Sequence, residues 1–123
     1  MVSKRQSKIS KALDNLDAAL QLYSDRQKGN DLPFLTVCKA LEVAFEYIWR
    51  ELKSRVEVEG LFAVSPKEAI RQAAVLGLIG GVEEWIAIAT ARNDSVHDYF
   101  GIPEPKYVEL AGKLLTLARK VKW

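Results

Sequence analysis

The sequence is poor in the residues that form disulfide bonds and most metal sites. Among 123 residues there is one cysteine, Cys38, and one histidine, His97. A single cysteine excludes an intramolecular disulfide, which is typical of a protein from a reducing cytosol. One cysteine and one histidine also exclude a Cys/His zinc site within one chain. We therefore expect neither a metal nor a cofactor.

Two further absences concern membranes and nucleic acids. No apolar run approaches the roughly 20 residues needed to cross a bilayer, and the polar start Met1–Gln6 lacks the hydrophobic segment of a signal peptide. The net charge is only +2, whereas dedicated electrostatic nucleic-acid binders are far more basic. We expect a cytoplasmic protein without membrane contact, in which any nucleic-acid contact comes from a local patch.

Hydrophobic residues make up 49% of the chain, and they recur with the period of a helix almost throughout. No run alternates with the period of two that a strand requires. The length suits one domain over residues 1–123. Short loops between the helical segments predict an all-α fold, an up-and-down bundle of about five helices. The predicted helices run from Ser3 to Gln27, from Asp31 to about Val56, from Ser65 to Gly77, from after Gly81 toward Tyr99, and from Pro105 to Lys122.

The second predicted helix is the clearest and is expected at the centre of the bundle. Its apolar residues alternate spacings of four and three from Phe34 to Leu52. Asp31 is a predicted N-cap, with Pro33 in the first turn. The third helix is predicted to begin with a capping box, Ser65-Pro66-Lys67-Glu68, in which the serine and glutamate side chains each bond the other's backbone N–H.

The fourth predicted helix carries ionisable groups where its pattern predicts burial. Its apolar stripe leads directly to Arg92. Asn93 and His97 are four residues apart and are expected on one face, and Ser95 and Tyr99 are expected together on a neighbouring face. Because a buried charge is costly unless it is paired or used, such a break in pattern indicates a candidate functional site.

The residue types at this site suit phosphodiester chemistry. A histidine with a pKa near ~6.5 acts as base or acid at neutral pH, and the guanidinium of Arg92 suits a phosphate and its more charged transition state. The pair therefore favours metal-independent RNA cleavage by the neighbouring 2′-hydroxyl. That reaction needs both a base and an acid, and a chain with one histidine supplies both only in a two-fold homodimer with a composite site.

Several of these residues also have a purely structural interpretation. An Arg–His pair on a helix is common in structural polar networks, and Tyr99 is also compatible with a tyrosine at the edge of the core. Cys38 lies on an apolar stripe and is expected to be inert. The basic residues near the start of the chain are expected to form a solvated face, or else a patch for RNA or a partner.

The motif Arg92-x4-His97-x-Tyr99, with the polar Asn93 after the arginine, resembles the signature of the HEPN family. Three further segments and one tryptophan resemble its nucleotidyltransferase substrate-binding-protein subfamily, the HepT-like toxins, in the same order. These are Ala40–Trp49, Ser65–Arg71, Gly77–Ile79 and Trp85. The resemblance covers roughly Leu13 to Lys122.

This resemblance implies a helical bundle that dimerises through the motif region. It also implies an endoribonuclease toxin in which Arg92 and His97 carry RNA cleavage, supported by Asn93 and Ser95. The implied partner is a minimal nucleotidyltransferase antitoxin that silences the toxin by transferring AMP to Tyr99. An alternative view of the family implies a non-catalytic subunit that binds nucleotide or substrate for its nucleotidyltransferase.

Overall fold

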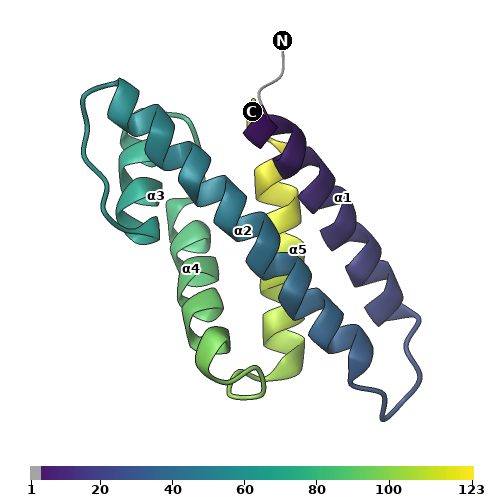
Figure 1. Ribbon diagram of the computed structural model, residues 1–123. Helices are drawn as coiled ribbons and strands as arrows, with labels where there is room; N and C mark the ends of the chain where they lie inside the picture. Colours follow the sequence, from purple (N-terminus) through teal and green to yellow (C-terminus); the bar gives the residue numbers. More distant parts are fainter. Residues whose placement is uncertain (1–3) are drawn as a thin grey trace.

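The computed structural model describes residues 4–123, except for the side chains of Val96 and His97. Over these residues the chain forms five helices and no strand. They are α1 (Lys4–Ser24), α2 (Leu32–Val58), α3 (Pro66–Val75), α4 (Val82–His97) and α5 (Glu104–Arg119). The helices form an up-and-down bundle (Figure 1), so the predicted all-α fold is confirmed. The predicted start of the first helix, Ser3, lies outside the described residues.

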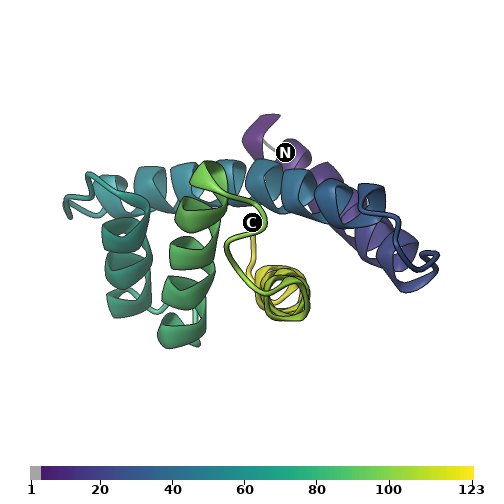
Figure 2. The ribbon, with the colours of Figure 1, turned by 90° about the horizontal axis from the view of Figure 1, so that it is seen from below.

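The bundle is organised around α2, which contacts each of the other four helices. With 27 residues, it spans about 40 Å, long enough to pack against two groups of neighbours. Figure 2 shows α1 beside one end of α2, and α3, α4 and α5 below it. A continuous stripe of apolar side chains at helical spacing drives this packing. Its fully buried members include Phe34, Cys38, Leu41, Phe45, Ile48 and Leu52.

All five helices contribute to one hydrophobic core cluster. Its largest fully buried side chains are Trp85, Tyr107, Phe34 and Phe45, and each such side chain stabilises the fold by about 1.5–3 kcal/mol. The predicted single domain over residues 1–123 stays a prediction. Within residues 4–123, no helix is long and apolar enough to cross a membrane.

Two of the predicted helix caps differ from those in the structure. Ser65 Oγ accepts the Glu68 N–H at 3.2 Å, as predicted, but the Glu68 carboxylate accepts the N–H of Val64 at 3.3 Å instead of that of Ser65. Asp31 occupies the N-cap position of α2 without a capping bond from its side chain. Asn30 Oδ1 instead accepts the N–H of Leu32 at 3.1 Å, which satisfies one of the free donors at the helix start.

The end of α4 is the main departure from the predicted helices. The helix ends at His97, so Tyr99 lies beyond it in the loop to α5. Asp98 takes an extended conformation, with φ −159°, and its Oδ1 accepts the N–H of Phe100 at 3.0 Å. This local turn competes with the helix for the backbone donor. The prediction that Ser95 and Tyr99 share a helix face is therefore wrong.

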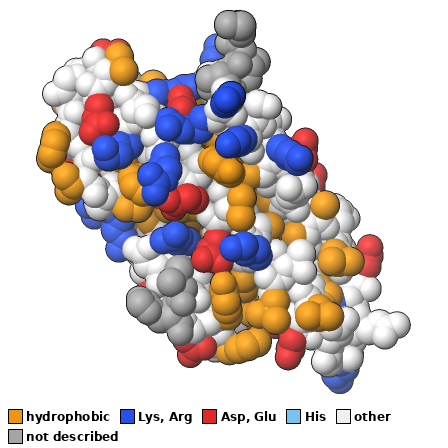
Figure 3. Space-filling view, viewed as in Figure 1, with side chains coloured by type: hydrophobic (Ala, Val, Ile, Leu, Met, Phe, Trp, Pro, Cys, Tyr) orange, Lys and Arg blue, Asp and Glu red, His pale blue; other side chains and the backbone are white. Residues whose placement is uncertain are grey.

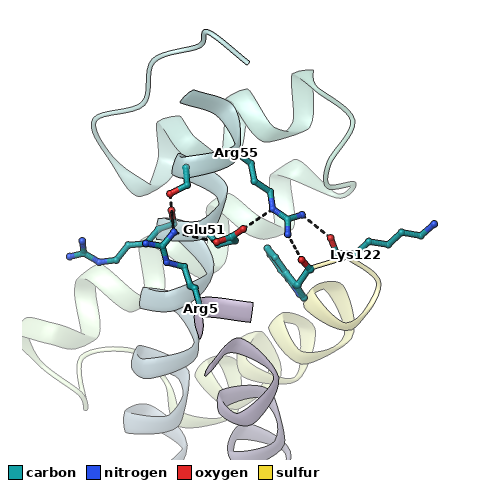
Figure 4. Close-up of polar contacts among 7 residues, drawn as sticks. Arg5, Glu51, Arg55 and Lys122 are labelled. Atoms are coloured by element: carbon teal, nitrogen blue, oxygen red, sulfur yellow. Dashed lines mark hydrogen bonds and ion pairs between the residues drawn. The ribbon is translucent and has the colours of Figure 1, made fainter. Parts of the chain in front are cut away.

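A polar network at the opposite end of α2 ties three segments together (Figure 4). Glu51 of α2 pairs with Arg5 of α1 at 3.2 Å and with Arg55 of α2 at 2.8 Å. Arg55 also donates to the carbonyl of Lys122 at 2.7 Å and to that of Trp123, and its guanidinium lies 5.6 Å from the centre of the Trp123 ring. One carboxylate therefore links the start of α1 and the segment after α5 to the central helix.

Candidate functional site

Arg92 lies near the end of α4, with its guanidinium directed toward α2. Its side chain is 25% exposed, and its Nη2 forms an ion pair with Glu46 at 3.4 Å. Nη1 donates to Asn93 Oδ1 at 3.4 Å. Nε is buried, with no hydrogen-bond partner among the described side chains. Both contacts of Arg92 are therefore long, one exposed and one partly buried, and a quarter of the side chain stays open to solvent.

The other predicted site residues of α4 lie on different sides of the helix. Asn93 is exposed and contacts Arg92. Ser95 is fully buried; its hydroxyl donates to the Arg92 carbonyl at 3.0 Å and lies 3.2 Å from the hydroxyl of Tyr107. Ser95 thus anchors this turn of α4 to α5, and its predicted supporting role stays a prediction.

His97 is the last residue of α4. Its side chain lies outside the described residues, so the predicted joint role of Arg92 and His97 in RNA cleavage stays a prediction. The backbone places the two residues five positions apart on one helix, about 140° around its axis.

Tyr99 is half-buried and lies against α2. Its hydroxyl donates a hydrogen bond of 2.8 Å to Glu42 Oε2. This bond, together with burial and the charge of Glu42, raises the pKa of Tyr99 above its usual 10.0, because ionisation would place two negative charges side by side. Nearby Cys38 is fully buried, which raises the pKa of its thiol to about 12. It therefore stays protonated, as expected for an inert cysteine.

Sequence reasoning missed the contribution of α2 to this site. An open groove of about 330 Å³ is formed by α2 side chains and by Arg92 of α4. Its polar α2 residues are Lys39, Glu42, Glu46 and Arg50. The last three recur every fourth position, so they form a polar row beside the buried stripe. That spacing was visible in the sequence, but nothing in it indicated which other helix the row faces.

Glu46 is the electrostatic centre of the groove. Its carboxylate accepts hydrogen bonds from Trp49 Nε1 at 2.9 Å and from Arg50 Nε at 2.6 Å, in addition to the Arg92 contact. Burial alone would raise the pKa of Glu46, but the two hydrogen bonds and the charges of Arg50 and Arg92 outweigh it and lower the pKa. Glu46 is therefore ionised at neutral pH and partly neutralises both arginines.

A larger apolar groove of about 790 Å³ continues from this one between α1 and α2. The two grooves share Lys39 and Val43. Small side chains such as Ala18 and Ala40 line the larger groove, together with leucines of both helices. Figure 3 shows hydrophobic side chains gathered on this face over α1 and α2, beside a cluster of charged ones. The candidate site thus lies next to an exposed apolar surface.

No group of three or more His, Cys, Asp or Glu among the described residues could hold a metal ion.

Comparison with known protein families identifies a family that covers most of the chain. The family described as nucleotidyltransferase substrate binding protein like matches residues 4–100, from the start of α1 to the residue after Tyr99. The chain belongs to this HEPN-related family, and the predicted resemblance is confirmed. No curated protein matches the chain in a sequence comparison.

Proposed function

We propose that this protein is a HEPN-type, metal-independent endoribonuclease toxin of the cytoplasm, held in check by a minimal nucleotidyltransferase antitoxin. The observation that carries the proposal is the position of Arg92. This motif arginine lines an open groove, where two long contacts, to Glu46 and Asn93, hold it. An RNA phosphate approaching the groove meets two arginines, Arg50 and Arg92, which share the carboxylate of Glu46 as their ion-pair partner.

The proposed reaction divides between two residues of the motif. Arg92 stabilises the phosphate as negative charge develops in the transition state. His97 takes the proton of the 2′-hydroxyl, and a second His97 protonates the leaving oxygen. Because each chain has one histidine, the two roles require a homodimer in which both chains contribute to the site.

The apolar groove between α1 and α2 supports the dimer. It adjoins the Arg92 groove through Lys39 and Val43, so a second copy that covers it would lie next to Arg92. Small side chains in this groove permit close approach of a helix. The dimer would bury the apolar surface and complete the site in one step.

The proposed antitoxin acts at Tyr99. The Tyr99 hydroxyl lies on the loop after α4 and is hydrogen-bonded to Glu42, which lines the same groove as Arg92. AMP on Tyr99 would add a negative charge and a bulky nucleoside next to that groove. Both effects oppose the entry of an RNA phosphate.

The test is expression of the wild type, Arg92→Ala and His97→Ala, with Arg119→Ala as a matched control. Arg119 forms its ion pairs with Asp14 and Asp17 on α1, outside the groove. We expect slowed growth and RNA cleavage with the wild type and the control, and neither with the two motif variants. A wild type that leaves RNA intact, or motif variants that cleave as well as the control, would contradict the proposal.

A second candidate is a non-catalytic subunit that presents nucleotide or substrate to the nucleotidyltransferase. The family description favours it, and a groove lined by Lys39, Arg50 and Arg92 also suits the phosphates of a nucleotide. Mass spectrometry of the co-expressed pair separates the two candidates. AMP on Tyr99 indicates a silenced enzyme, whereas an unmodified Tyr99 in a chain that binds ATP by itself indicates the binding subunit.

A further inference from the structure

The hydroxyl of Tyr99 is a poor nucleophile in its present surroundings. Its pKa is raised above 10.0, so the phenol is neutral at physiological pH. A neutral phenol attacks phosphorus slowly unless a base removes its proton during the attack. The proton is already directed at one acceptor, Glu42 Oε2, at 2.8 Å, within the range required of a general base.

We propose that Glu42 is the general base that activates Tyr99 as the acceptor of AMP. This inference rests on the proposed pairing with a nucleotidyltransferase. As the Tyr99 Oη bond to the α-phosphorus of ATP forms, the bond from that phosphorus to the pyrophosphate oxygen breaks. The phenol proton passes to Glu42 Oε2, and pyrophosphate leaves with the electron pair. The acceptor chain thus supplies a catalytic group for its own modification.

The other carboxylates near Tyr99 are engaged elsewhere. Glu46 holds Trp49, Arg50 and Arg92, and Asp98 Oδ1 accepts the N–H of Phe100. In contrast, no lysine or arginine among the described side chains forms an ion pair with Glu42. Its carboxylate is therefore directed at the Tyr99 hydroxyl and not at a cation among the described residues.

Glu42 also has a simpler structural role, because its bond to Tyr99 fixes the loop after α4 against α2. The variant Glu42→Gln separates the two roles. A glutamine oxygen still accepts the phenol hydrogen bond at the same chain length, but it is far too weak a base to take the proton. Glu42→Asp keeps a carboxylate and moves it by one methylene.

The experiment measures the initial rate of AMP transfer to Tyr99 by the cognate nucleotidyltransferase with ATP labelled at the α-phosphate. Glu57→Gln, on the same helix and paired with Lys53, is the charge-matched control, and Tyr99→Phe defines the background. We expect Glu42→Gln to lower the rate about 100-fold or more, Glu42→Asp to retain more activity than Glu42→Gln, and Glu57→Gln to match the wild type. Thermal unfolding of Glu42→Gln should match the wild type, which shows that the variant is folded.

Each part can fail separately. A Glu42→Gln rate within about threefold of the wild type, or a Glu42→Asp rate below that of Glu42→Gln, overturns the role of Glu42 alone. If the wild type accepts AMP, Glu42→Gln does not, and the wild type cleaves no RNA, this inference is upheld and the proposed ribonuclease activity is refuted. A wild type that takes no AMP on Tyr99 overturns both the inference and the proposed antitoxin mechanism.

Discussion

Under the proposed function, Glu46 is the group with which an RNA phosphate would compete for Arg92. Replacing it with glutamine keeps the size of the side chain but removes the negative charge, and it leaves one acceptor oxygen in place of the two that bond Trp49 and Arg50. The ion pairs to both arginines are lost, and the charge of the groove becomes more positive by one unit. We therefore expect Glu46→Gln to bind RNA more tightly than the wild type.

The size of this effect follows from the exposure of the pair. The side chains of Arg92 and Glu46 are 25% and 34% exposed, so solvent screens their attraction, and pairs of this kind contribute about 0.2–1 kcal/mol. Because about 1.4 kcal/mol corresponds to a tenfold change in affinity, the gain should be about 1.5- to 5-fold. One additional phosphate contact should also steepen the salt dependence of binding by about 0.7 in the log–log slope for a single strand.

The assay is fluorescence anisotropy with a short labelled RNA, carried out in a His97→Ala background so that the RNA stays intact. Glu57→Gln in the same background is the control for net charge. It lies eleven residues further along α2, about 16 Å away, roughly twice the screening length at physiological salt. Glu57→Gln should therefore leave RNA affinity nearly unchanged.

An unchanged or weaker affinity in Glu46→Gln would refute the idea that Glu46 competes with RNA. An equal gain in Glu46→Gln and Glu57→Gln would show that overall charge, and not the groove, controls binding. In either case Arg92 would bind its phosphate without displacing Glu46.

Three further predictions concern stability and assembly. Arg55→Met should destabilise the fold by about 1–2 kcal/mol, because the ion pair with Glu51 and the hydrogen bonds to the carbonyls after α5 are lost. Calorimetry should show this as a fall of roughly 3–10 °C in Tm, and an unchanged Tm would contradict it. Because the folded pKa of Glu46 is lowered, its stabilisation is present above the usual carboxyl value of about 4.3 and is lost as the pH falls through the lowered folded value. Urea unfolding should therefore show a steeper acid loss in the wild type than in Glu46→Gln, and parallel curves would argue against it. Ala18→Arg, at an exposed position of the apolar groove, should convert the proposed dimer to a folded monomer in light scattering, and a dimer that persists would place the interface elsewhere.

The parts of the fold that were predictable depend on spacing along one helix. The apolar stripe from Phe34 to Leu52 predicted the buried face of α2, because burial of such a stripe repeats with the helical period. The end of α4 was not predictable in this way. The side-chain turn at Asp98 stops the helix before Tyr99, and a periodic pattern does not register such a local bond.

The candidate site was predictable only in part, for a similar reason. The motif indicated Arg92 and Tyr99, but their partners, Glu46 and Glu42, lie 46 and 57 residues away in the chain. Contacts between distant segments depend on how the helices pack. In the sequence alone, the two glutamates resemble polar residues on the solvent-exposed face of a helix. Only the packed bundle shows that Arg92 pairs with Glu46 and Tyr99 with Glu42.

Those two carboxylates lie four residues apart on α2, about 6 Å along its axis, and each contacts a different motif residue. Substitutions during divergence should therefore be linked in pairs, position 42 with position 99 and position 46 with position 92. A homologue that has lost its motif tyrosine has no further use for an acid at 42, yet should keep one at 46 for as long as it keeps its arginine. Under the proposed function, positions 42 and 46 of α2 would therefore indicate separately which homologues retain modification of the tyrosine and which retain RNA cleavage.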